Sequence, residues 1–318
     1  MNSARIPAKV TVKTRLLTAA EFQQLADVPP EVEWFANIRN PGTRRAYENA
    51  IKDFMVFTGI KRPAEFRTVT RAHVIAWRDD LGERILSGTT IRHRMAALSS
   101  LFQHLCDNNA VTHNPVKGVK RPRQESGEGK TPVLGDAQAR KLLVAPPDKS
   151  LKGLRDRAIL ATLLYHGLRR EELCKLTVAD FRHERRGVQH LKVSGKGEKT
   201  RYVPLHGVAK DLIEEYLQEA GHDAGALFRP LRDSSGGGRK RSITPDGIYK
   251  LVRAYSALLG FQIGAHALRA TAATNALDHN ADIAKVQEWL GHSNIATTRL
   301  YDRRKTRPED SPTFKVSY

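Results

Sequence analysis

Residues 265–277 read AHALRATAATNAL, a run in which nearly every position is small or apolar. A helix that is apolar on all sides has no face for water, so this stretch predicts a helix buried inside a domain. His266 and Arg269 are the exceptions, and their three-residue spacing places them on one side of that helix. A buried guanidinium costs free energy unless an anion or carboxylate meets it. The pair is therefore either a satisfied core pair or part of a binding site.

A second pair with the same spacing is Arg169 and Glu172, at the start of a predicted helix within HGLRREELCKL. Taken alone, it is better explained as a surface ion pair of little energetic value. Lys196, in SGKGEKTR, lies at the tip of a predicted hairpin, where a lysine is usually a solvated turn residue. The alternative is that the tip carries an ammonium to a leaving oxygen. The glycine-lysine spacing of a nucleotide-binding P-loop is absent.

Near the end of the chain, residues 294–304 read NIATTRLYDRR. Tyr301 here is either a half-buried aromatic residue or a nucleophile aimed at a phosphate, because it is followed closely by four cations. His292 follows a glycine stop and precedes Ser293, a predicted helix cap, so it lies at a helix junction. The four cations are Arg303, Arg304, Lys305 and Arg307.

The charge of the chain indicates a polyanionic partner. Its 53 Lys and Arg against 34 Asp and Glu give a net charge of +19 and a pI near 10.1. Residues 1–130 contain 21 of the cations and 13 of the anions, so both halves share the excess. Nucleic acid is the commonest such partner, although a generally basic solvated surface explains the composition too.

Composition also sets the expected compartment and chemistry. No apolar run approaches the roughly 18 residues of a membrane span, and the N-terminus has no apolar core of signal-peptide length. Cys106 and Cys174 are isolated, which argues against a zinc site or a disulfide framework. We expect a cytoplasmic, nucleoid-associated protein without a metal or cofactor.

A length of 318 residues favours two domains. We predict a helical N-terminal domain at residues 1–120, a linker at 121–132 and a second domain at 133–318. Thr89 or Thr90 is the predicted cap of a helix beginning there. The predicted hairpin spans residues 188–205. Helical periodicity is found at 41–58, 70–86, 89–106, 131–146, 151–167, from 244, 266–278, 281–290 and 293–301.

The ordered series GLRREEL, GKGEKTRYVPL, HALR and LGHSNIATTRLY resembles the tyrosine recombinase family of phage integrases and Xer-type site-specific recombinases. The likeness spans about residues 130–305, and the helical first part resembles the core-binding domain of that family. The resemblance implies a mainly α protein, with an all-helical, SAM-like N-terminal domain. It also implies a mixed α/β, mostly helical catalytic domain with a small antiparallel sheet, the two forming a C-shaped DNA clamp.

The resemblance assigns a role to each matching position. Arg169 and Arg269 would hold the non-bridging oxygens of the scissile phosphate, with His292 as a third donor. Tyr301 would attack phosphorus and form a 3′-phosphotyrosyl link, so that neither ATP nor metal is needed. The remaining roles are proton movement at the tyrosine for His266, general acid toward the 5′-hydroxyl for Lys196, and orientation of its neighbours for Glu172. Ala270 stands where many relatives have histidine, and we expect no loss of activity from it.

The resemblance further implies double-stranded DNA with paired inverted half-sites as the partner, and a homotetramer on two duplexes that passes through a Holliday junction. The free protein would be a monomer or dimer. Arg44, Arg45, Arg92 and Arg94 are the predicted N-terminal DNA contacts, although solvated helix faces explain them nearly as well. Two alternatives stay open: a type IB topoisomerase that relaxes DNA, and a catalytically idle DNA-binding regulator.

Overall fold

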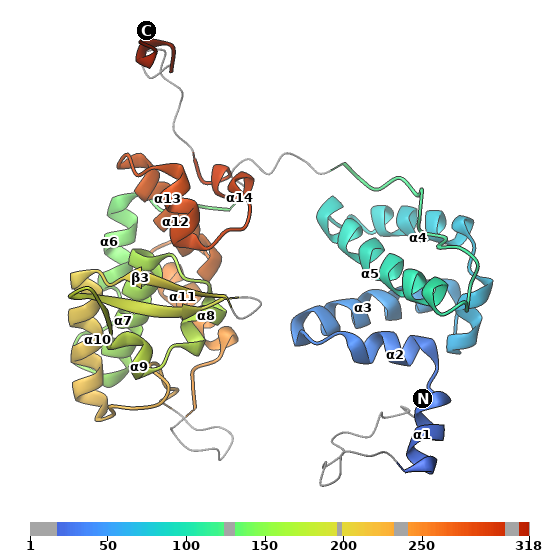
Figure 1. Cartoon of the computed structure of the whole chain (residues 1–318). Coiled ribbons are helices and arrows are strands. Elements are labelled where there is room, and N and C mark those ends of the chain that lie inside the picture. Colours follow the sequence, from blue (N-terminus) through green and yellow to red (C-terminus); the bar gives the residue numbers. More distant parts are fainter. Residues whose placement is uncertain (1–17, 124–130, 196–198, 232–240, 303–311, 318) are drawn as a thin grey trace. The chain divides into compact units, whose positions relative to one another are not determined.

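The chain forms two compact units, Met1–Ser126 and Gly127–Tyr318, each described here by itself (Figure 1). The computed structural model describes residues 18–123, 131–195, 199–231, 241–302 and 312–317. Within these ranges, no helix is long and apolar enough to cross a membrane. The finer limits predicted for the two domains and their linker remain predictions.

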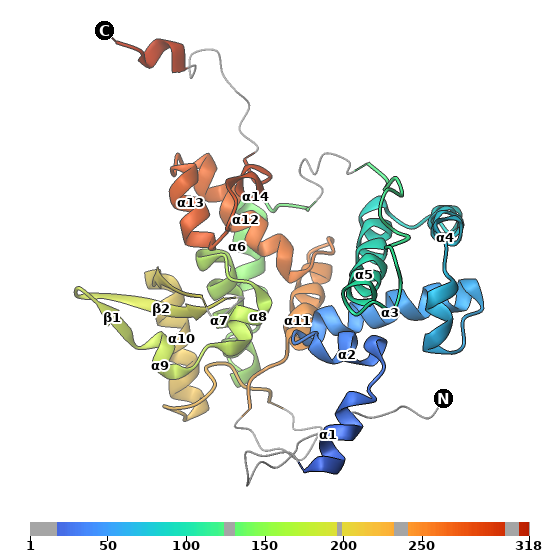
Figure 2. The same ribbon diagram turned by 45° about the vertical axis from the view of Figure 1, so that its right-hand side comes forward.

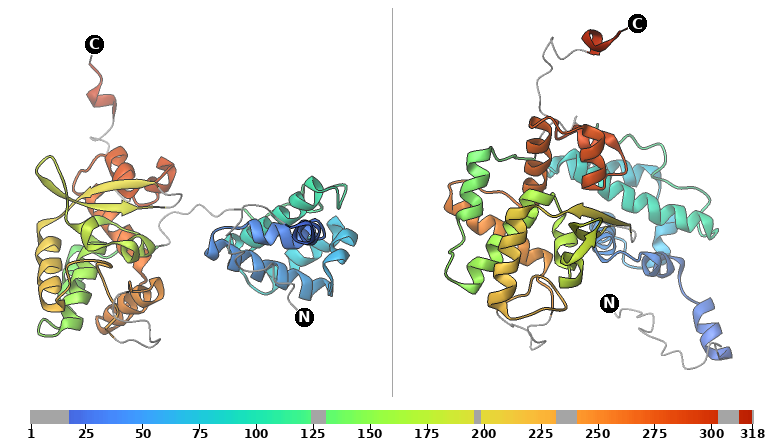
Figure 3. Two further views of the ribbon diagram at one scale, coloured as in Figure 1. Left: turned by 60° about the horizontal axis from the view of Figure 1, so that its bottom comes forward. Right: turned by 60° about the vertical axis from the view of Figure 1, so that its left-hand side comes forward.

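The described part of the N-terminal unit contains helices and no strands (Figure 3). The three helices expected from periodicity are present as α3, α4 and α5. The cap of α5 differs from the expectation of Thr89 or Thr90. The cap is Ser87, whose Oγ accepts from the backbone N–H of Thr90. The elements are α1 (Ala19–Ala26), α2 (Pro30–Asn37), α3 (Pro41–Thr58), η1 (Pro63–Thr68), α4 (Arg71–Glu83) and α5 (Gly88–Asp107).

The N-terminal core forms where the apolar faces of α3, α4 and α5 meet. The rings of Phe54 and Trp77 pack edge to face with 5.0 Å between their centroids, and both residues are fully buried. At the border of this core, Asp53 accepts from Trp77 Nε1 at 2.9 Å and pairs with Arg84 and Arg94. One carboxylate therefore ties together the three helices.

The C-terminal unit is mostly helical and contains one small antiparallel sheet in the order β1-β2-β3 (Figure 2). The expected hairpin is present as β2 and β3, whereas β1, α9 and α10 add to the expected elements. The elements are α6 (Asp136–Val144), α7 (Leu151–His166), α8 (Arg170–Lys175), α9 (Val178–Phe181), β1 (His183–Arg185), β2 (Val188–Ser194), β3 (Thr200–Pro204), α10 (Gly207–Ala220), α11 (Pro245–Leu258), α12 (Ala265–Asp278), α13 (Ile283–Leu290), α14 (Ile295–Arg299) and η4 (Pro312–Lys315).

Helix α12, the small-residue stretch quoted at the outset, is buried as expected and packs against α7, α11 and α13. Its alanines and threonines let the neighbouring helices approach closely. Gly167 ends α7 in the left-handed conformation, with φ of 58°. A Cβ there would lie 2.8 Å from Leu290 Cδ2, so both the backbone conformation and the nearby end of α13 favour glycine. This turn sets the position of Arg169, two residues later.

Ile85 offers a test of backbone strain in the N-terminal unit. It follows α4 with φ of 57° and is 91% exposed, so its side chain gains little from packing. A β-branched residue is disfavoured there by roughly 1–2 kcal/mol, whereas asparagine tolerates this conformation. Ile85→Asn should therefore raise the free energy of unfolding by about 1 kcal/mol. Urea unfolding followed by tryptophan fluorescence, to which Trp34 and Trp77 of this unit contribute, measures this change.

The control is Ile85→Val, which keeps the β-branch and should leave the urea midpoint unchanged. A midpoint that falls in Ile85→Asn would contradict the strain.

Candidate active site

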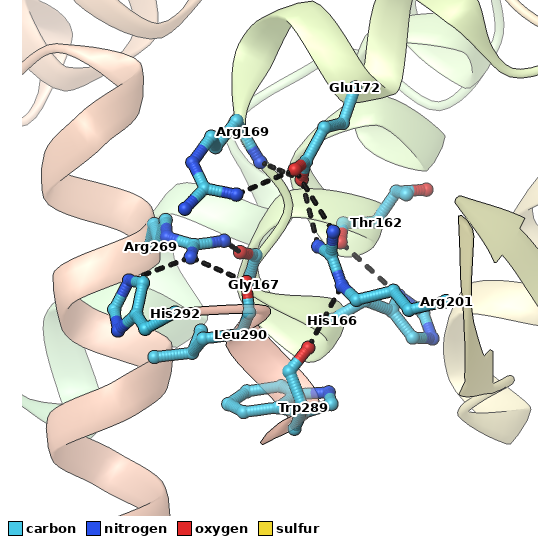
Figure 4. Close-up of polar contacts among 10 residues, drawn as sticks. All are labelled: Thr162, His166, Gly167, Arg169, Glu172, Arg201, Arg269, Trp289, Leu290 and His292. Carbon is cyan, nitrogen blue, oxygen red and sulfur yellow. Dashed lines mark hydrogen bonds and ion pairs between the residues drawn. The ribbon is translucent and has the colours of Figure 1, made fainter. Parts of the chain in front are cut away.

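A buried carboxylate organises the site at the junction of α7 and α8. Glu172, 4% exposed, accepts four hydrogen bonds (Figure 4). Its Oε1 accepts from Arg169 Nη1 at 2.7 Å and from Arg201 Nη1 at 2.9 Å, while Oε2 accepts from Arg169 N at 2.9 Å and from Arg201 Nη2 at 2.8 Å. Burial opposes ionisation of Glu172, yet these donors hold its pKa at about 2. The carboxylate is thus charged, and its acceptor sites are filled.

Arg269 projects from α12 and is 1% exposed. It donates to two helix-terminal carbonyls, through Nη1 to Gly167 O at 2.5 Å and through Nη2 to Leu290 O at 2.7 Å. Its Nη2 also meets His292 Nε2 at 2.8 Å. The anion or carboxylate expected beside this buried arginine is replaced, in the described residues, by neutral acceptors. The positive charge of Arg269 is therefore oriented but is not neutralised by these three partners.

The guanidinium groups of Arg169 and Arg269 lie next to each other (Figure 4). Burial, and then the positive charge of Arg169, lower the pKa of Arg269 to about 10. Arg269 therefore keeps its proton at neutral pH, although burial and the charge of Arg169 both disfavour its charged form. The side chain of Arg169 is 42% exposed, so the pair can be reached from solvent. Two neighbouring guanidinium groups of this kind favour a shared anion, which both can bind with two-pronged geometry.

Two histidines border this positive charge, and the pKa of each is lowered there. Burial, then Arg269 and Arg169, lower the pKa of His292 to about 4, and the same causes lower the pKa of His266. Because arginine can only donate, His292 Nε2 must accept from Arg269. The proton of His292 then resides on Nδ1, which donates to Thr298 Oγ1 at 2.9 Å.

Tyr301 lies beside His292, with 5.9 Å between the ring centroids and 30° between the ring planes. It is 7% exposed and packs in the small core formed by α12, α13 and the end of α14. Thr274 Oγ1 on α12 donates to Tyr301 O at 2.9 Å, and Tyr301 N donates to Thr298 O. The phenol is therefore held near His292 by its own chain.

The structure brings most of the predicted site residues into one place, but Lys196 lies outside the described residues. Its neighbour Gly195 is described, and the amide of Gly195 donates to Lys199 O at 2.8 Å, which closes the base of the hairpin. A Cβ on Gly195 would lie 3.8 Å from Glu172 Oε1, so the hairpin base adjoins the carboxylate. The residues brought together are Arg169, Glu172, His266, Arg269, His292 and Tyr301.

Arg201 is a member of this cluster that is missing from the predicted set. Besides its two bonds to Glu172, it donates through Nε to Trp289 O at 3.0 Å. A sequence signal exists for it. Arg201 and Val203 are two residues apart on β3, so they point to the same face, and Val203 is 1% exposed. An arginine on the inward face of a strand needs a partner, yet the sequence does not identify Glu172 as that partner.

The four predicted DNA-contacting arginines lie on the N-terminal unit in different environments. Arg44 donates to Ile38 O and Ala36 O, and Arg92 donates to Pro122 O. Arg94 pairs with Asp53 at 2.8 Å, whereas Arg45 is exposed. Their contacts with DNA remain predictions.

Metal-binding side chains do not gather in the described residues, where no group of three or more His, Cys, Asp or Glu could hold an ion.

Comparison with protein families gives two matches. Residues 37–110 match the phage integrase N-terminal SAM-like domain, and residues 132–307 match the phage integrase family itself. The second match covers more than half of the chain. The protein belongs to the phage integrase family. Its mainly helical fold is therefore a SAM-like N-terminal domain followed by the integrase domain with its three-stranded antiparallel sheet.

Curated relatives agree with this assignment. The tyrosine recombinase XerC of Pelobacter propionicus is 34% identical over 267 residues, covering 82% of this chain and 84% of that protein. The tyrosine recombinase XerD of Listeria monocytogenes serotype 4b is 30% identical over 265 residues, covering 81% of this chain and 86% of that protein. The chain is thus a tyrosine recombinase, a DNA strand-exchange enzyme, as the motif series implied. This assignment favours recombination over the topoisomerase alternative.

Solved structures share the fold at lower identity. The XerH recombinase bound to its palindromic difH substrate, in a post-cleavage complex, gives a TM-score of 0.66 at 22% identity, covering 81% of this chain and 75% of that one. A lambda integrase dimer bound to a core site gives 0.67 at 16% identity, covering 93% of this chain and all of that one.

His292 provides a test of the electrostatics of the site. With its pKa lowered from 6.5 to about 4, the imidazole should stay neutral and keep a constant NMR shift from about pH 7.5 to about pH 5.5. The unfolded chain binds this proton more readily between the two pKa values. The corresponding stability is therefore complete above pH 6.5 and is lost as pH falls toward 4.

The His292→Gln spectrum identifies the resonance. Titration of that resonance near pH 6.5 would contradict the described environment.

Proposed function

We propose that this enzyme cleaves and rejoins DNA strands at a specific site through a 3′-phosphotyrosyl intermediate on Tyr301. The observation that carries the proposal is the pair of adjacent guanidinium groups of Arg169 and Arg269. Glu172, the carboxylate that pairs with Arg169, has its four acceptor positions filled by Arg169 and Arg201. The pair therefore favours an external anion, and a phosphodiester offers two non-bridging oxygens that suit two guanidinium groups.

We assign the attack on phosphorus to the phenol of Tyr301, whose ring lies beside His292. Tyr301 Oη forms a bond to phosphorus, and the bond from phosphorus to the 5′-oxygen breaks. The phenolic proton moves to His266. Arg169 and Arg269 stabilise the charge that develops on the non-bridging oxygens. We assign protonation of the departing 5′-oxygen to Lys196. Negative charge on the bound phosphate favours the imidazolium of His292, which then has an Nε2–H to donate to the phosphate.

Rejoining reverses these steps with a different 5′-hydroxyl. That hydroxyl attacks the phosphotyrosyl phosphorus, the new DNA ester forms and Tyr301 recovers its proton. One phosphoester replaces another at each step, so the energy of the broken bond is retained. The reaction therefore needs no ATP, and the arginines supply the positive charge that a metal provides in other phosphoryl-transfer enzymes.

We infer the assembly from the relatives. The XerH structure holds a palindromic substrate, and one lambda integrase structure is a tetramer bound to a Holliday junction. For the present enzyme we propose four protomers on two duplexes, each duplex carrying paired inverted half-sites, with strand exchange through a Holliday junction. The net charge of +19 supports extensive phosphate contact. In the N-terminal unit, exposed Arg45 is the best placed of the four predicted contacts. The proposed location is the cytoplasm, at the nucleoid.

Tyr301→Phe tests the chemistry. The phenylalanine ring fits the same packing, so the variant should bind DNA but form no covalent adduct. Binding selection with this variant from random-sequence duplexes first supplies a target site. The selected site is then prepared as a suicide substrate with a nick beside the cleavage position, which lets the short fragment with the free 5′-hydroxyl leave and traps the adduct. Denaturing gels measure adduct formation.

Wild-type protein is the positive control and should form the adduct. If the protein were a catalytically idle regulator, the wild-type protein would bind the same duplex but would form no adduct. An adduct with Tyr301→Phe would reject Tyr301 as the nucleophile.

A further inference from the structure

We propose that Arg201 is a positioning residue, which fixes Arg169 and the segment leading to His292 in the geometry required for phosphoryl transfer. This inference rests on the proposed function. It adds a residue that does not contact the phosphate but on which the two phosphate-binding groups depend.

The contacts of Arg201 join three elements. From β3 it reaches α8 through a two-pronged pair with Glu172, at 2.9 and 2.8 Å, and it reaches the end of α13 through Trp289 O at 3.0 Å. Its side chain is 15% exposed, so these partners replace most of its water. A planar fork is rigid, and filling it on two sides leaves Arg201 little freedom to move.

The first consequence concerns Arg169. The carboxylate of Glu172 receives one donor from each arginine on each oxygen, so Arg201 holds one edge of the group that orients Arg169. Without Arg201, Glu172 would retain its charge in a buried place with half of its donors. It would then rotate or admit water, and Arg169 would lose its fixed direction.

The second consequence concerns His292. Arg201 binds Trp289 O, and the adjacent carbonyl, Leu290 O, accepts from Arg269. Gly291 follows with φ of 67°, and a Cβ there would lie 3.2 Å from Arg201 Cδ. Arg201 therefore packs directly on the turn that directs His292 toward Arg269. One side chain thus supports both the Arg169 side and the His292 side of the proposed phosphate site.

Arg201 should influence the rate of cleavage far more than the affinity for DNA. Its described partners are Glu172 and the turn at the end of α13. Affinity for DNA, in contrast, is spread over many phosphate contacts along the duplex. A displacement of catalytic groups by about 1 Å costs on the order of 100-fold in rate. We therefore expect Arg201→Gln to slow single-turnover cleavage by about 100-fold, with the dissociation constant for the selected duplex near that of wild type.

The chain offers a matched control in Arg155. Like Arg201, it is a nearly buried arginine, with a side chain 9% exposed, and it pairs with a buried carboxylate, that of Asp156. It also donates to a backbone carbonyl, Arg229 O at 3.0 Å. Arg155→Gln and Arg201→Gln should therefore both reduce thermal stability, but folded Arg155→Gln should cleave at the wild-type rate. Full-length proteins are compared on the nicked substrate at a temperature where thermal melting shows each variant to be folded.

A double-mutant cycle tests the route through Glu172. If Arg201 acts by holding that carboxylate, Glu172→Gln and Arg201→Gln should each slow cleavage, and the double variant should be slower by much less than the product of the two effects. Fully multiplicative effects would overturn the proposed route. Cleavage by Arg201→Gln at the wild-type rate, or an equal loss in Arg155→Gln, would overturn the positioning role itself. Absence of any adduct with wild-type protein would instead count against the proposed function.

Discussion

The site depends on an excess of positive charge among side chains that are largely buried. Arg169 and Arg201 both pair with one buried carboxylate, Glu172, and the guanidinium group of Arg269 lies next to that of Arg169. Arg201 and Glu172 neutralise each other, which leaves Arg169 and Arg269 side by side with positive charge in excess. Burial and mutual repulsion depress the pKa of Arg269 to about 10 without removing its proton. A bound phosphate relieves this repulsion, and charge growing on that phosphate relieves it further, which is the electrostatic basis of the proposed catalysis.

The fold maintains this unfavourable arrangement through tight packing. Helix α12 has small residues on nearly every side, so α7 and α13 approach it closely and their terminal carbonyls meet Arg269. Gly167 and Gly291 end those two helices in the left-handed conformation, and each glycine leaves room for a neighbouring side chain, Leu290 and Arg201 respectively. The cluster is thus fixed by backbone geometry as well as by ion pairs. The packing of the surrounding core offsets the free energy of repulsion between the arginines.

Local patterns in the sequence predict much of this structure. Helical periodicity identifies α3, α4, α5, α7 and α11, and the three-residue spacing places His266 and Arg269 on one side of a buried helix. The partners of these residues are less accessible to such reasoning. Arg201 meets Glu172 across 29 positions, and Arg269 meets Leu290 O across 21, so no local pattern records either contact. The family resemblance predicts that the motifs converge on one site, but the catalytic positions that it implies do not include Arg201.

The helix caps also differ from the predicted ones by a few residues, because several neighbouring hydroxyls and amides can cap one helix end. Ser87 caps α5, and Asn294 caps α14 where Ser293 was expected.

The central claim is that Arg169 and Arg269 act on the negative charge of the scissile phosphate. Replacing one non-bridging oxygen of that phosphate by a methyl group removes the charge while keeping the position of the phosphorus. Cleavage rates of wild-type, Arg169→Ala and Arg269→Ala proteins should be compared on the native and methyl-substituted substrates. The account predicts that each arginine substitution costs far less on the neutral substrate than on the native one. Equal losses on both substrates would contradict it.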